Sequence, residues 1–354
     1  MKFLIFADPH WSSYSSIVRS RGPKYSMRLE NLIASMDWVE ATAVRYGCDA
    51  VVCLGDFFDK AELNSEEVTA LQDIKWSNIP HYYLVGNHEM GRGDLSFSSS
   101  HLFNLCPNSV VVDQPSVLFS DDTHEVCALP YILESDRKEF SEYFPHTDKS
   151  RVVFSHNDIS GIQMGKFISK EGFSIDSIED NCSLFINGHL HNGSWVSSKI
   201  INVGNLSGQN FSEDAREYSH NVMILDNVAR SIEWEENPYA FNFYKIDLTD
   251  FKDGVTDEGD FCVQHLLTNL KLNSVVTIKV TPQNKTFIED LIGTCHNIIC
   301  CRVVVDTMRG DKVNSYASDT PVMSLDHLQK FSDYVKEYLG TDSIVIEELQ
   351  KVIE

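Results

Sequence analysis

Polar side chains of the kinds that bind metal ions follow several short apolar runs along the chain. They read Asp8-Pro9-His10, Gly55-Asp56-Phe57-Phe58-Asp59, Gly86-Asn87-His88-Glu89, Ser155-His156 and Gly188-His189-Leu190-His191. Any one of these groups is ordinary, because Asp-x-His and Gly-Asp are common in turns. All of them in this order, each after an apolar run, indicate one site at the ends of strands, where open α/β sheets bind ligands.

The side chains in these groups are carboxylates, imidazoles and one amide, with no cysteine. This donor set suits borderline divalent ions such as manganese, iron or zinc, and it has too many nitrogens for a site built for magnesium or calcium alone. Side chains two positions apart on an extended segment point the same way, so Asp8 and His10 could share one ion. His189 and His191 could reach one ion each or a common pair.

The apolar runs before these groups are predicted to be buried strands of an α/β fold. They are rich in Val, Ile and Phe, and they span residues 3–7, 51–54, 82–85, 110–112, 152–154 and 184–186. Between the first two, apolar residues recur at helical spacing over 26–46 and Gly47 follows, which predicts an amphipathic helix. Strand–helix–strand units of this kind imply parallel pairing, with helices on the faces of the sheet.

The pattern changes after residue 195. Short turns separate strand candidates at 199–203, 221–225, 231–234 and 241–246, which predicts an antiparallel continuation of the sheet. The acidic stretch 247–260 has the composition of a linker. Beyond it we expect a strand at 275–280, a helix at 284–293, a strand at 298–305, a polar loop at 306–320, and helices at 324–339 and 343–353. The predicted parts are therefore a main domain (1–246), a linker (247–260), a small α+β region (261–320) and C-terminal helices (321–354).

The composition is that of a folded protein with an excess of acidic groups. Hydrophobic residues make up 42% of the 354 residues, and 29 Lys and Arg stand against 52 Asp and Glu, for a formal net charge of −23. A protein that holds nucleic acid unaided usually has a cationic face. If DNA is the substrate, bound metal, a local cationic patch or a partner subunit must supply much of the attraction.

The nine cysteines form no paired framework, which favours a reducing compartment, and we expect the cytoplasm. The apolar start of the chain is interrupted by Asp8 and does not resemble a signal peptide. No apolar run approaches the roughly 20 residues of a membrane span, so no membrane association is expected.

Taken together, the motifs resemble those of the calcineurin-like metallophosphoesterases, from the first residue to about residue 235. Within that superfamily the chain is most similar to the SbcD-type nuclease subunits, which work with an SMC-like ABC ATPase in DNA repair and recombination and have phage counterparts. The finer similarities are Gly55-Asp56-Phe57-Phe58-Asp59, Leu95-Ser96-Phe97-Ser98, Leu129-Pro130-Tyr131, and Ser155-His156 followed by Gly161. The region after residue 260 is similar to the capping region of these subunits in pattern only.

The resemblance implies a two-sheet α/β sandwich flanked by helices, with a small C-terminal α+β capping region and terminal helices. It also implies a centre of two divalent ions, manganese first, with magnesium, iron or zinc as alternatives. One ion would be held by Asp8, His10 and His191 and the other by Asn87, His156 and His189, with Asp56 bridging the two.

The resemblance assigns His88 as the general acid that protonates the leaving oxygen. It further implies DNA as the substrate, an SMC-like ABC ATPase as partner, a homodimer, and a bacterial or phage-infected cell. The family joins its ATPase through C-terminal helices. The helical stripe Leu325, Leu328, Phe331, Val335 and Leu339 could therefore be a docking surface, and its other interpretation is a buried core.

Other polar residues near the motifs have two interpretations each. Asp59 could support a ligand or contact the substrate, or it could be a surface carboxylate. Glu89 could orient or repel charge beside His88. Arg92 and Arg216 are candidates for phosphate contacts, although a solvent-exposed loop arginine is the commoner case. The glycines around Arg92 loosen the loop after His88, which bears on substrate contacts and not on the metal ligands.

These observations leave more than one function open. The first hypothesis is a metal-dependent DNA exo- and endonuclease subunit that works with an ATPase. The second is a phosphoesterase acting on cyclic nucleotides, nucleotides or phosphoproteins, because the same metals serve those reactions and fold does not fix substrate. The third is a non-catalytic scaffold, and the presence of every ligand and of His88 argues against it.

Overall fold

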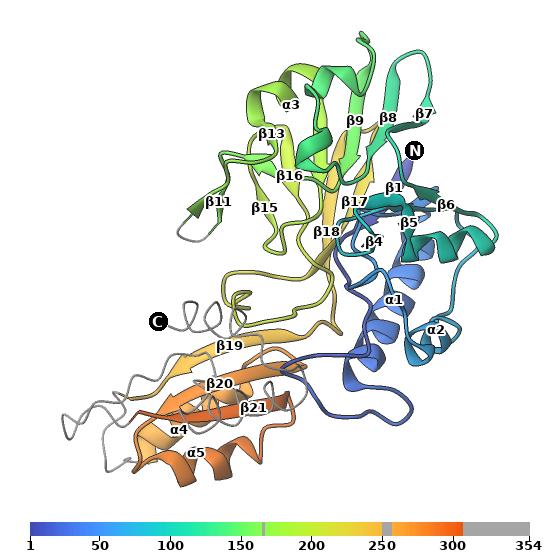
Figure 1. The fold of residues 1–354 in the computed structure, drawn as a ribbon. Helices are drawn as coiled ribbons and strands as arrows, with labels where there is room; N and C mark the ends of the chain where they lie inside the picture. Colours follow the sequence, from blue (N-terminus) through green and yellow to red (C-terminus); the bar gives the residue numbers. More distant parts are fainter. Residues whose placement is uncertain (165–166, 250–256, 307–354) are drawn as a thin grey trace, which may run out of the picture. The chain divides into compact units, whose positions relative to one another are not determined.

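The first sheet of the computed structural model carries the N-terminal strand at its centre. The structure describes residues 1–164, 167–249 and 257–306. The strand order is β18-β17-β1-β2-β3-β6. The parallel strands are β1 (Lys2–Phe6), β2 (Ala50–Cys53), β3 (His81–Leu84) and β6 (Ser109–Val112), and β17 (Asn221–Asp226) and β18 (Ser231–Glu236) are added antiparallel (Figure 1). The predicted strands before the first three motifs are therefore confirmed, as is the antiparallel addition of 221–225 and 231–234.

A second sheet has the order β15-β16-β14-β9-β8-β7. Its strands are β7 (Ser116–Ser120), β8 (His124–Leu129), β9 (Ser150–Ser155), β14 (Leu184–Asn187), β15 (Ser194–Trp195) and β16 (Ile200–Asn202). The inner strands pair in parallel, and the two outer ones are antiparallel. The strand predicted at 199–203 is present, but its placement in an antiparallel continuation is wrong, because β16 pairs in parallel with β14 and only the short β15 lies antiparallel to it.

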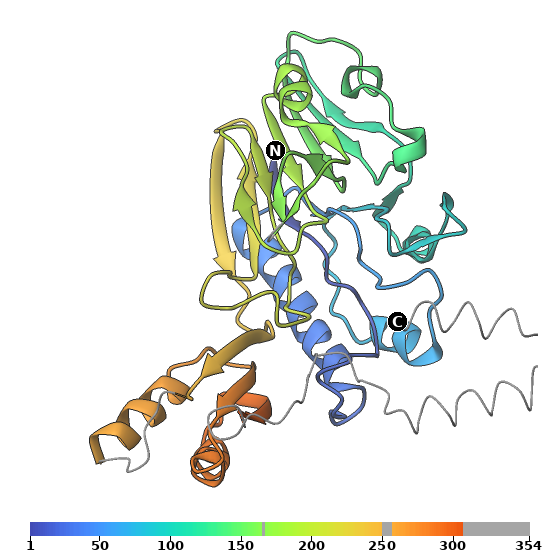
Figure 2. The ribbon, with the colours of Figure 1, turned by 60° about the vertical axis from the view of Figure 1, so that its left-hand side comes forward.

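The two sheets pack face to face through one apolar cluster. It joins Phe3, Ile5 and Val52 from the first sheet to Phe154 and Ile186 from the second. The rings of Phe3 and Phe154 meet edge to face, with centroids 5.4 Å apart. Helices cover the outer faces: α1 (Met27–Tyr46) lies along the first sheet (Figure 2) and α3 (Ile175–Asn181) packs with the second. The predicted two-sheet α/β sandwich is thus confirmed.

Helix α1 has the termini that its sequence predicts. The Ser26 side chain accepts a hydrogen bond from the Leu29 amide, and Gly47 ends the helix with a left-handed φ of 61°. Beside its apolar stripe the helix also buries polar side chains, among them Arg28, Asn31 and Ser35. Asn31 and Ser35 bond to the segments around Ser207, Asn237 and Tyr239, which fastens later parts of the chain to this helix.

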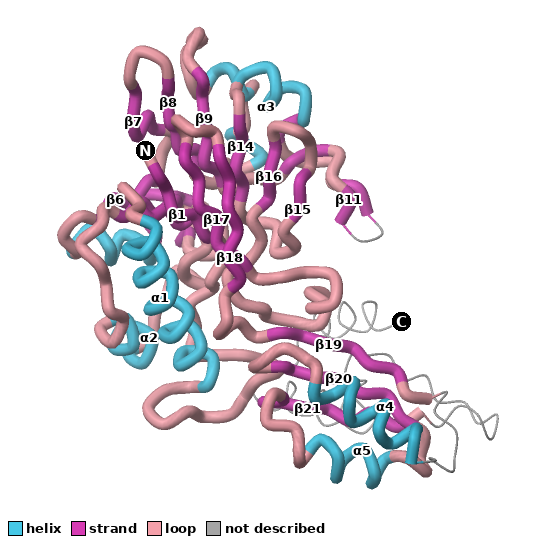
Figure 3. The backbone as a smooth tube through the Cα atoms, turned by 180° about the vertical axis from the view of Figure 1, so that it is seen from behind, coloured by secondary structure: helices cyan, strands magenta, loops and turns pink. Residues whose placement is uncertain are grey.

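A third, smaller sheet has the order β19-β20-β21, from β19 (Asn242–Asp247), β20 (Ser274–Val280) and β21 (Ile298–Val305). One face is covered by α4 (Asp257–Thr268) and α5 (Lys285–Ile292), as Figure 3 shows. The predicted elements at 275–280, 284–293 and 298–305 are confirmed. The prediction that 241–246 continues an antiparallel sheet is wrong, because β19 pairs in parallel with β20. Helix α4 begins within the stretch that looked like a linker.

Short elements complete the described chain. They are α2 (Ser65–Leu71), the two-stranded pairs β4 (Met90–Gly91) with β5 (Asp94–Ser98), β10 (Ile159–Ser160) with β13 (Phe173–Ser174) and β11 (Gln163–Met164) with β12 (Phe167–Ile168), and the 3₁₀ segments Ser99–Leu105, Glu134–Asp136 and Phe140–Glu142. None of the helices in the described ranges is long and apolar enough to cross a membrane. The loop and helices expected over 306–320, 324–339 and 343–353, with their apolar stripe, lie outside the described residues, apart from Asp306.

Candidate metal centre

The polar residues predicted to bind metal lie at the carboxyl ends of parallel strands from both sheets. Asp8 and His10 follow β1, Asp56 follows β2, and Asn87 and His88 follow β3. His156 follows β9 from the second sheet, and His189 and His191 follow β14. Because the sheets pack face to face and these strands end at the same edge, segments almost 200 residues apart are brought to one place, as the contacts below show.

The first group of side chains consists of Asp8, His10 and His191, whose ligand atoms lie within 4.8 Å of one another. The Nε2 atoms of His10 and His191 are 3.1 Å apart, so two lone-pair-bearing nitrogens face the same point. The Asp8 carboxylate is fully buried and accepts the backbone N–H of His189 at 3.0 Å. The group therefore holds one carboxylate and two imidazoles that converge on one point.

The second group consists of Asp56, His156 and His189, again within 4.8 Å. The Asn87 carbonyl oxygen Oδ1 lies 3.1 Å from His156 Nε2 and 3.0 Å from His189 Nδ1, so it belongs to the same group. His156 Nε2 is also 3.1 Å from Asp56 Oδ2. The structure thus brings together the side chains that the resemblance assigns to a second ion.

Asp56 lies between the two groups. Its Oδ2 is 3.1 Å from His156 Nε2 and 3.9 Å from His10 Nε2, one residue of each group. Burial raises the pKa of the Asp56 carboxyl, but the surrounding imidazoles, His156 first, outweigh burial and lower the pKa overall. A carboxylate kept anionic between two sets of nitrogen and oxygen donors is what a bridge between two cations requires.

His156 of the second group carries a proton in the absence of an ion. Burial alone lowers the pKa of His156, but the adjacent Asp56 carboxylate outweighs it and raises the pKa to about 9. A proton therefore occupies the place at which a metal cation would relieve the same negative charge, and binding an ion releases it. The donor set fits divalent metal ions and does not by itself identify the metal.

The backbone at the centre is strained. Asp8, His10, Asp56 and His189 all have left-handed φ values, of 50°, 47°, 48° and 73°. Such conformations cost non-glycine residues about 1–2 kcal/mol each, and they let the chain turn sharply enough to present each side chain inward. A Cβ at Gly86 would collide with the Asp56 carboxylate, and one at Gly55 with the His156 ring. The glycines of these motifs therefore make room for the ligands.

His88 stands at the open side of the centre and is 46% exposed in its side chain. Its backbone N–H donates to Asp56 Oδ1 at 2.9 Å, and its ring meets that of His10 edge to face. Its Nδ1 lies 3.3 Å from the Asp59 carbonyl oxygen. With Nδ1 donating to this carbonyl, Nε2 is the nitrogen left to exchange a proton with a bound substrate.

Two acidic residues of the motifs support the ligands. The Asp59 carboxylate lies 3.2 Å from His10 Nδ1, on the edge of the ring opposite the atom that faces His191. Buried Glu89 accepts the backbone N–H groups of Phe58 and Gly86, which ties the loop after β2 to the loop after β3. Burial raises the pKa of Glu89 to about 7, and the nearby Asp56 carboxylate adds to the rise. Glu89 is therefore a brace between loops.

Two further carboxylates were missed by the sequence analysis. Glu213 is buried, lies 2.9 Å from His191 Nδ1, and also accepts the Asn205 amide and the Gln209 N–H. Asp158 lies 3.1 Å from His189 Nε2. A carboxylate on the far nitrogen of a ligating histidine fixes the tautomer and ring orientation. His156 and Asp158 are two positions apart, as are Asp8 and His10. This spacing is the sequence signal that could have identified Asp158.

The two arginines named as phosphate candidates lie elsewhere. Arg92 is in the turn between β4 and β5 with a left-handed φ of 58° and its guanidinium over the Phe97 ring, beside a cavity that His88 and the ligands do not line. Arg216 pairs with the Asp214 carboxylate and donates to the Lys245 carbonyl oxygen. Neither contacts the centre, whereas Arg28 of α1, unremarked in the sequence, donates to the Pro9 carbonyl oxygen between two ligands.

Comparison with known proteins gives one family match. Residues 1–217 match the family model described as calcineurin-like phosphoesterase. A search of curated proteins found no match. Among solved structures, the chain is similar to the TT1561 protein of Thermus thermophilus (12% identity, TM-score 0.40, 66% of this chain and 98% of that chain). It is also similar to a dimetal phosphatase from Danio rerio (12% identity, TM-score 0.41, 63% and 91%).

Proposed function

The chain belongs to the calcineurin-like phosphoesterase family, and from this premise we propose that it is a DNA exo- and endonuclease subunit dependent on two divalent metal ions. The observation that carries the hydrolytic part of the proposal is the convergence of two ligand groups on Asp56. Two ions held there, manganese first, would polarise the phosphodiester, activate the attacking water and stabilise the leaving oxygen.

The protein's own residues supply position and protons. Asp56, anionic and buried, lies between the two ligand groups, near His10 of one and His156 of the other. The left-handed turns at Asp8, His10 and His189 aim their side chains inward. His88, as an imidazolium, would donate its Nε2 proton to the leaving oxygen of the cleaved strand and then regain a proton from solvent, to which its side chain is open.

Support for DNA as the substrate comes from the sequence similarities to SbcD-type subunits. Two of them have a local explanation in the structure. Phe57 and Phe58 of the Gly-Asp-Phe-Phe-Asp motif pack against Phe103 beneath the centre, so they support it. The Tyr131 ring of Leu-Pro-Tyr lies 6.0 Å from the His189 ring, where it could contact a nucleotide. With this excess of acidic residues, a nuclease subunit would depend on its ATPase partner and on a second copy of the chain for part of the DNA binding.

The test is hydrolysis with manganese of four substrates: linear duplex DNA, single-stranded DNA, bis(p-nitrophenyl) phosphate and p-nitrophenyl phosphate. The His88→Ala variant is run in parallel. Metal-dependent loss of DNA that the substitution abolishes supports the nuclease. Turnover of the esters with both DNAs intact, alone and with the ATPase added, contradicts it.

The second candidate is a phosphoesterase for cyclic nucleotides, nucleotides or phosphoproteins. The net charge of −23 favours it, since a small substrate needs no extended cationic surface. Its signature in the same experiment is hydrolysis of the small esters without hydrolysis of either DNA.

A further inference from the structure

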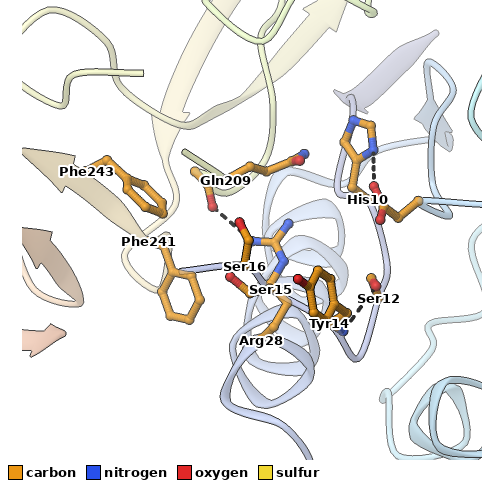
Figure 4. Close-up of a pocket in the computed structure, with 11 residues that line it drawn as sticks. His10, Ser12, Tyr14, Ser15, Ser16, Arg28, Gln209, Phe241 and Phe243 are labelled. Atoms are coloured by element: carbon orange, nitrogen blue, oxygen red, sulfur yellow. Dashed lines mark hydrogen bonds and ion pairs between the residues drawn. The ribbon is translucent and has the colours of Figure 1, made fainter. Parts of the chain in front are cut away.

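A small cavity adjoins the metal centre on the side of His10. It has a volume of about 170 Å³, and its walls come from the loop after β1, from α1 and from the segment after β16. Figure 4 shows the rings of Phe241 and Phe243 on one side of it and the His10 imidazole on the other, with Arg28 and Gln209 between them. The cavity is smaller than the roughly 300–1,000 Å³ of pockets that hold whole small molecules, so it suits a single chemical group.

Arg28 places a buried positive charge at this cavity. Its side chain is only 4% exposed, and its guanidinium donates to the neutral carbonyl oxygens of Pro9 at 2.8 Å and Gly208 at 3.0 Å. No carboxylate lies within ion-pair distance of it in the described ranges; Glu213 and Asp59 act on it only from farther away. Burial lowers the pKa of Arg28 to about 10, which still leaves it charged. A buried cation without a contacting anion is costly and favours an anionic ligand.

A second side chain at the cavity has a donor without a hydrogen bond. The amide nitrogen Nε2 of Gln209 is buried and makes no hydrogen bond with any described residue. Of the nearby hydroxyls, Ser12 Oγ accepts from the Tyr14 N–H and donates to Glu67 Oε1, whereas Ser15 Oγ accepts from the Val18 N–H. The Arg28 guanidinium and the unpaired Gln209 amide are therefore donors that suit a phosphate oxyanion.

One carboxylate, that of Asp59, also lines the cavity. It lies 3.2 Å from His10 Nδ1, so its charge is directed to the imidazole. The other edge of that ring, Nε2, faces His191 and the metal centre. His10 thus separates the cavity from the ion site by the width of one ring, and the cavity adjoins the position of the reacting phosphate without including it.

We propose that this cavity binds the phosphate next to the one being cleaved, so that the enzyme contacts two consecutive phosphates of a strand. The inference rests on the proposed function and deepens it. Arg28 and the Gln209 amide contact the neighbouring phosphate, and the rings of Phe241 and Phe243 give an apolar wall for the adjoining sugar or base. Strands with consecutive phosphates are then preferred over substrates with a single one.

The test uses trithymidylate and two analogues in which one or the other phosphodiester is replaced by a neutral methylphosphonate. Because Arg28 also anchors the Pro9 and Gly208 backbones and its loss could unfold the centre, the variant is Gln209→Glu, which puts a negative charge at the cavity. The matched control is Gln264→Glu, an exposed position on α4. KM and kcat are measured with manganese. Binding of the same strands is measured in EDTA, which gives a readout without hydrolysis.

In the parent protein and in Gln264→Glu, neutralising the neighbouring phosphate is expected to raise KM about tenfold, the scale of one charge-assisted hydrogen bond. In Gln209→Glu, KM for unmodified trithymidylate rises about tenfold and the methylphosphonate adds little, because the two changes remove the same interaction. Affinities in EDTA are expected to follow the same order.

Equal effects of the methylphosphonate in the parent and in Gln209→Glu would overturn the inference, as would no effect in either. The outcome for the proposed function is separate. If trithymidylate is hydrolysed but the second phosphate does not lower KM, the nuclease proposal stands and the proposed role of the cavity is wrong. Failure to hydrolyse any strand removes the nuclease, and the binding measured in EDTA still decides about the cavity.

Discussion

The two halves of the candidate metal centre are built from similar ligands but held in different ways. In the half formed by Asp8, His10 and His191, both imidazoles have a carboxylate behind them, Asp59 and Glu213. In the half formed by Asn87, His156 and His189, the ring of His156 is held by the neutral carbonyl oxygen of Leu54 at 2.9 Å, and only His189 faces a carboxylate, Asp158. Carboxylate partners make imidazoles more basic ligands. The first half should therefore bind its ion more tightly.

The halves also differ in their surroundings. The first half adjoins the Arg28 cavity, a small cavity of about 170 Å³ with a buried guanidinium at its wall. The second lies beside the Tyr131 ring and a broad hollow of about 760 Å³ that Tyr131 and Tyr143 help to line. A DNA strand bound across the centre would contact the charged Arg28 side chain on one side and the Tyr131 and Tyr143 rings on the other. Only the residue shared by both halves, Asp56, is expected to affect them equally.

Substituting that shared residue should have the largest effect. Asp56→Asn keeps the shape and the acceptor for the His88 N–H but removes the bridging charge. We expect kcat to fall by about 10³-fold, the upper range for one electrostatic group. Metal content measured by mass spectrometry should fall in both halves. A variant that keeps both ions and loses less than tenfold in kcat would show that Asp56 is not a bridge.

His88→Ala should reduce kcat on DNA by about 10²-fold, the lower range for general acid catalysis, since water can reach the exposed site. Both ions should stay bound, because the His88 side chain is not among the ligands assigned to either half; it does lie within 4.8 Å of ligand atoms of His10 and Asp56, so metal content is measured as well. The loss should be much smaller for bis(p-nitrophenyl) phosphate, whose leaving group needs little protonation. Equal losses on both substrates would exclude proton donation as the role of His88.

The difference between the halves is tested by Glu213→Gln and Asp158→Asn. Each should weaken the affinity for one ion by about 10–100-fold, the range for residues that orient metal ligands. Glu213→Gln should act on the tighter of the two ions and Asp158→Asn on the weaker, as resolved by metal titration calorimetry. If both variants weaken the same ion, the division into halves is wrong.

The smallest expected effect is on the pH dependence of the free energy of unfolding of the metal-free protein. The pKa of His156 is raised to about 9 in the folded state, above its ordinary value of about 6.5. Its contribution to stability is therefore fully present below about pH 6.5 and is lost as the pH rises through about 9. The free energy of unfolding in EDTA should fall over that window. With manganese bound it should stay flat, because the ion replaces the proton; a parallel decline in both states would contradict this.

Sequence reasoning could predict which side chains come together because each candidate ligand lies just past an apolar strand. Parallel strands end at the same edge of a sheet. A motif such as Gly86-Asn87-His88 therefore identifies the residues and also the edge at which they lie. It also predicted α1, whose apolar spacing and Gly47 are local signals. The same reasoning failed for β19, since whether a strand pairs in parallel depends on the later strand that it meets.

The supporting residues were harder to predict because they act across the fold. Glu213 lies in a loop after β16 with no local pattern and reaches His191 from 22 residues away. Arg28 lies in an amphipathic helix, where a charged residue next to the apolar stripe is usually exposed. What makes it buried is the segment around Gly208, distant by 180 residues. Such partners follow from tertiary packing and not from spacing.

The left-handed backbone at Asp8, His10, Asp56 and His189 has a consequence for how this sequence responds to selection. Glycine or asparagine would adopt these conformations at lower cost, so a library screened for heat resistance alone should accumulate them at these positions. Such replacements would relieve backbone strain and remove the side chains of the candidate metal centre. The backbone strain of the described chain is therefore concentrated in residues of the candidate metal centre, where relieving it would remove the side chains that the chemistry needs.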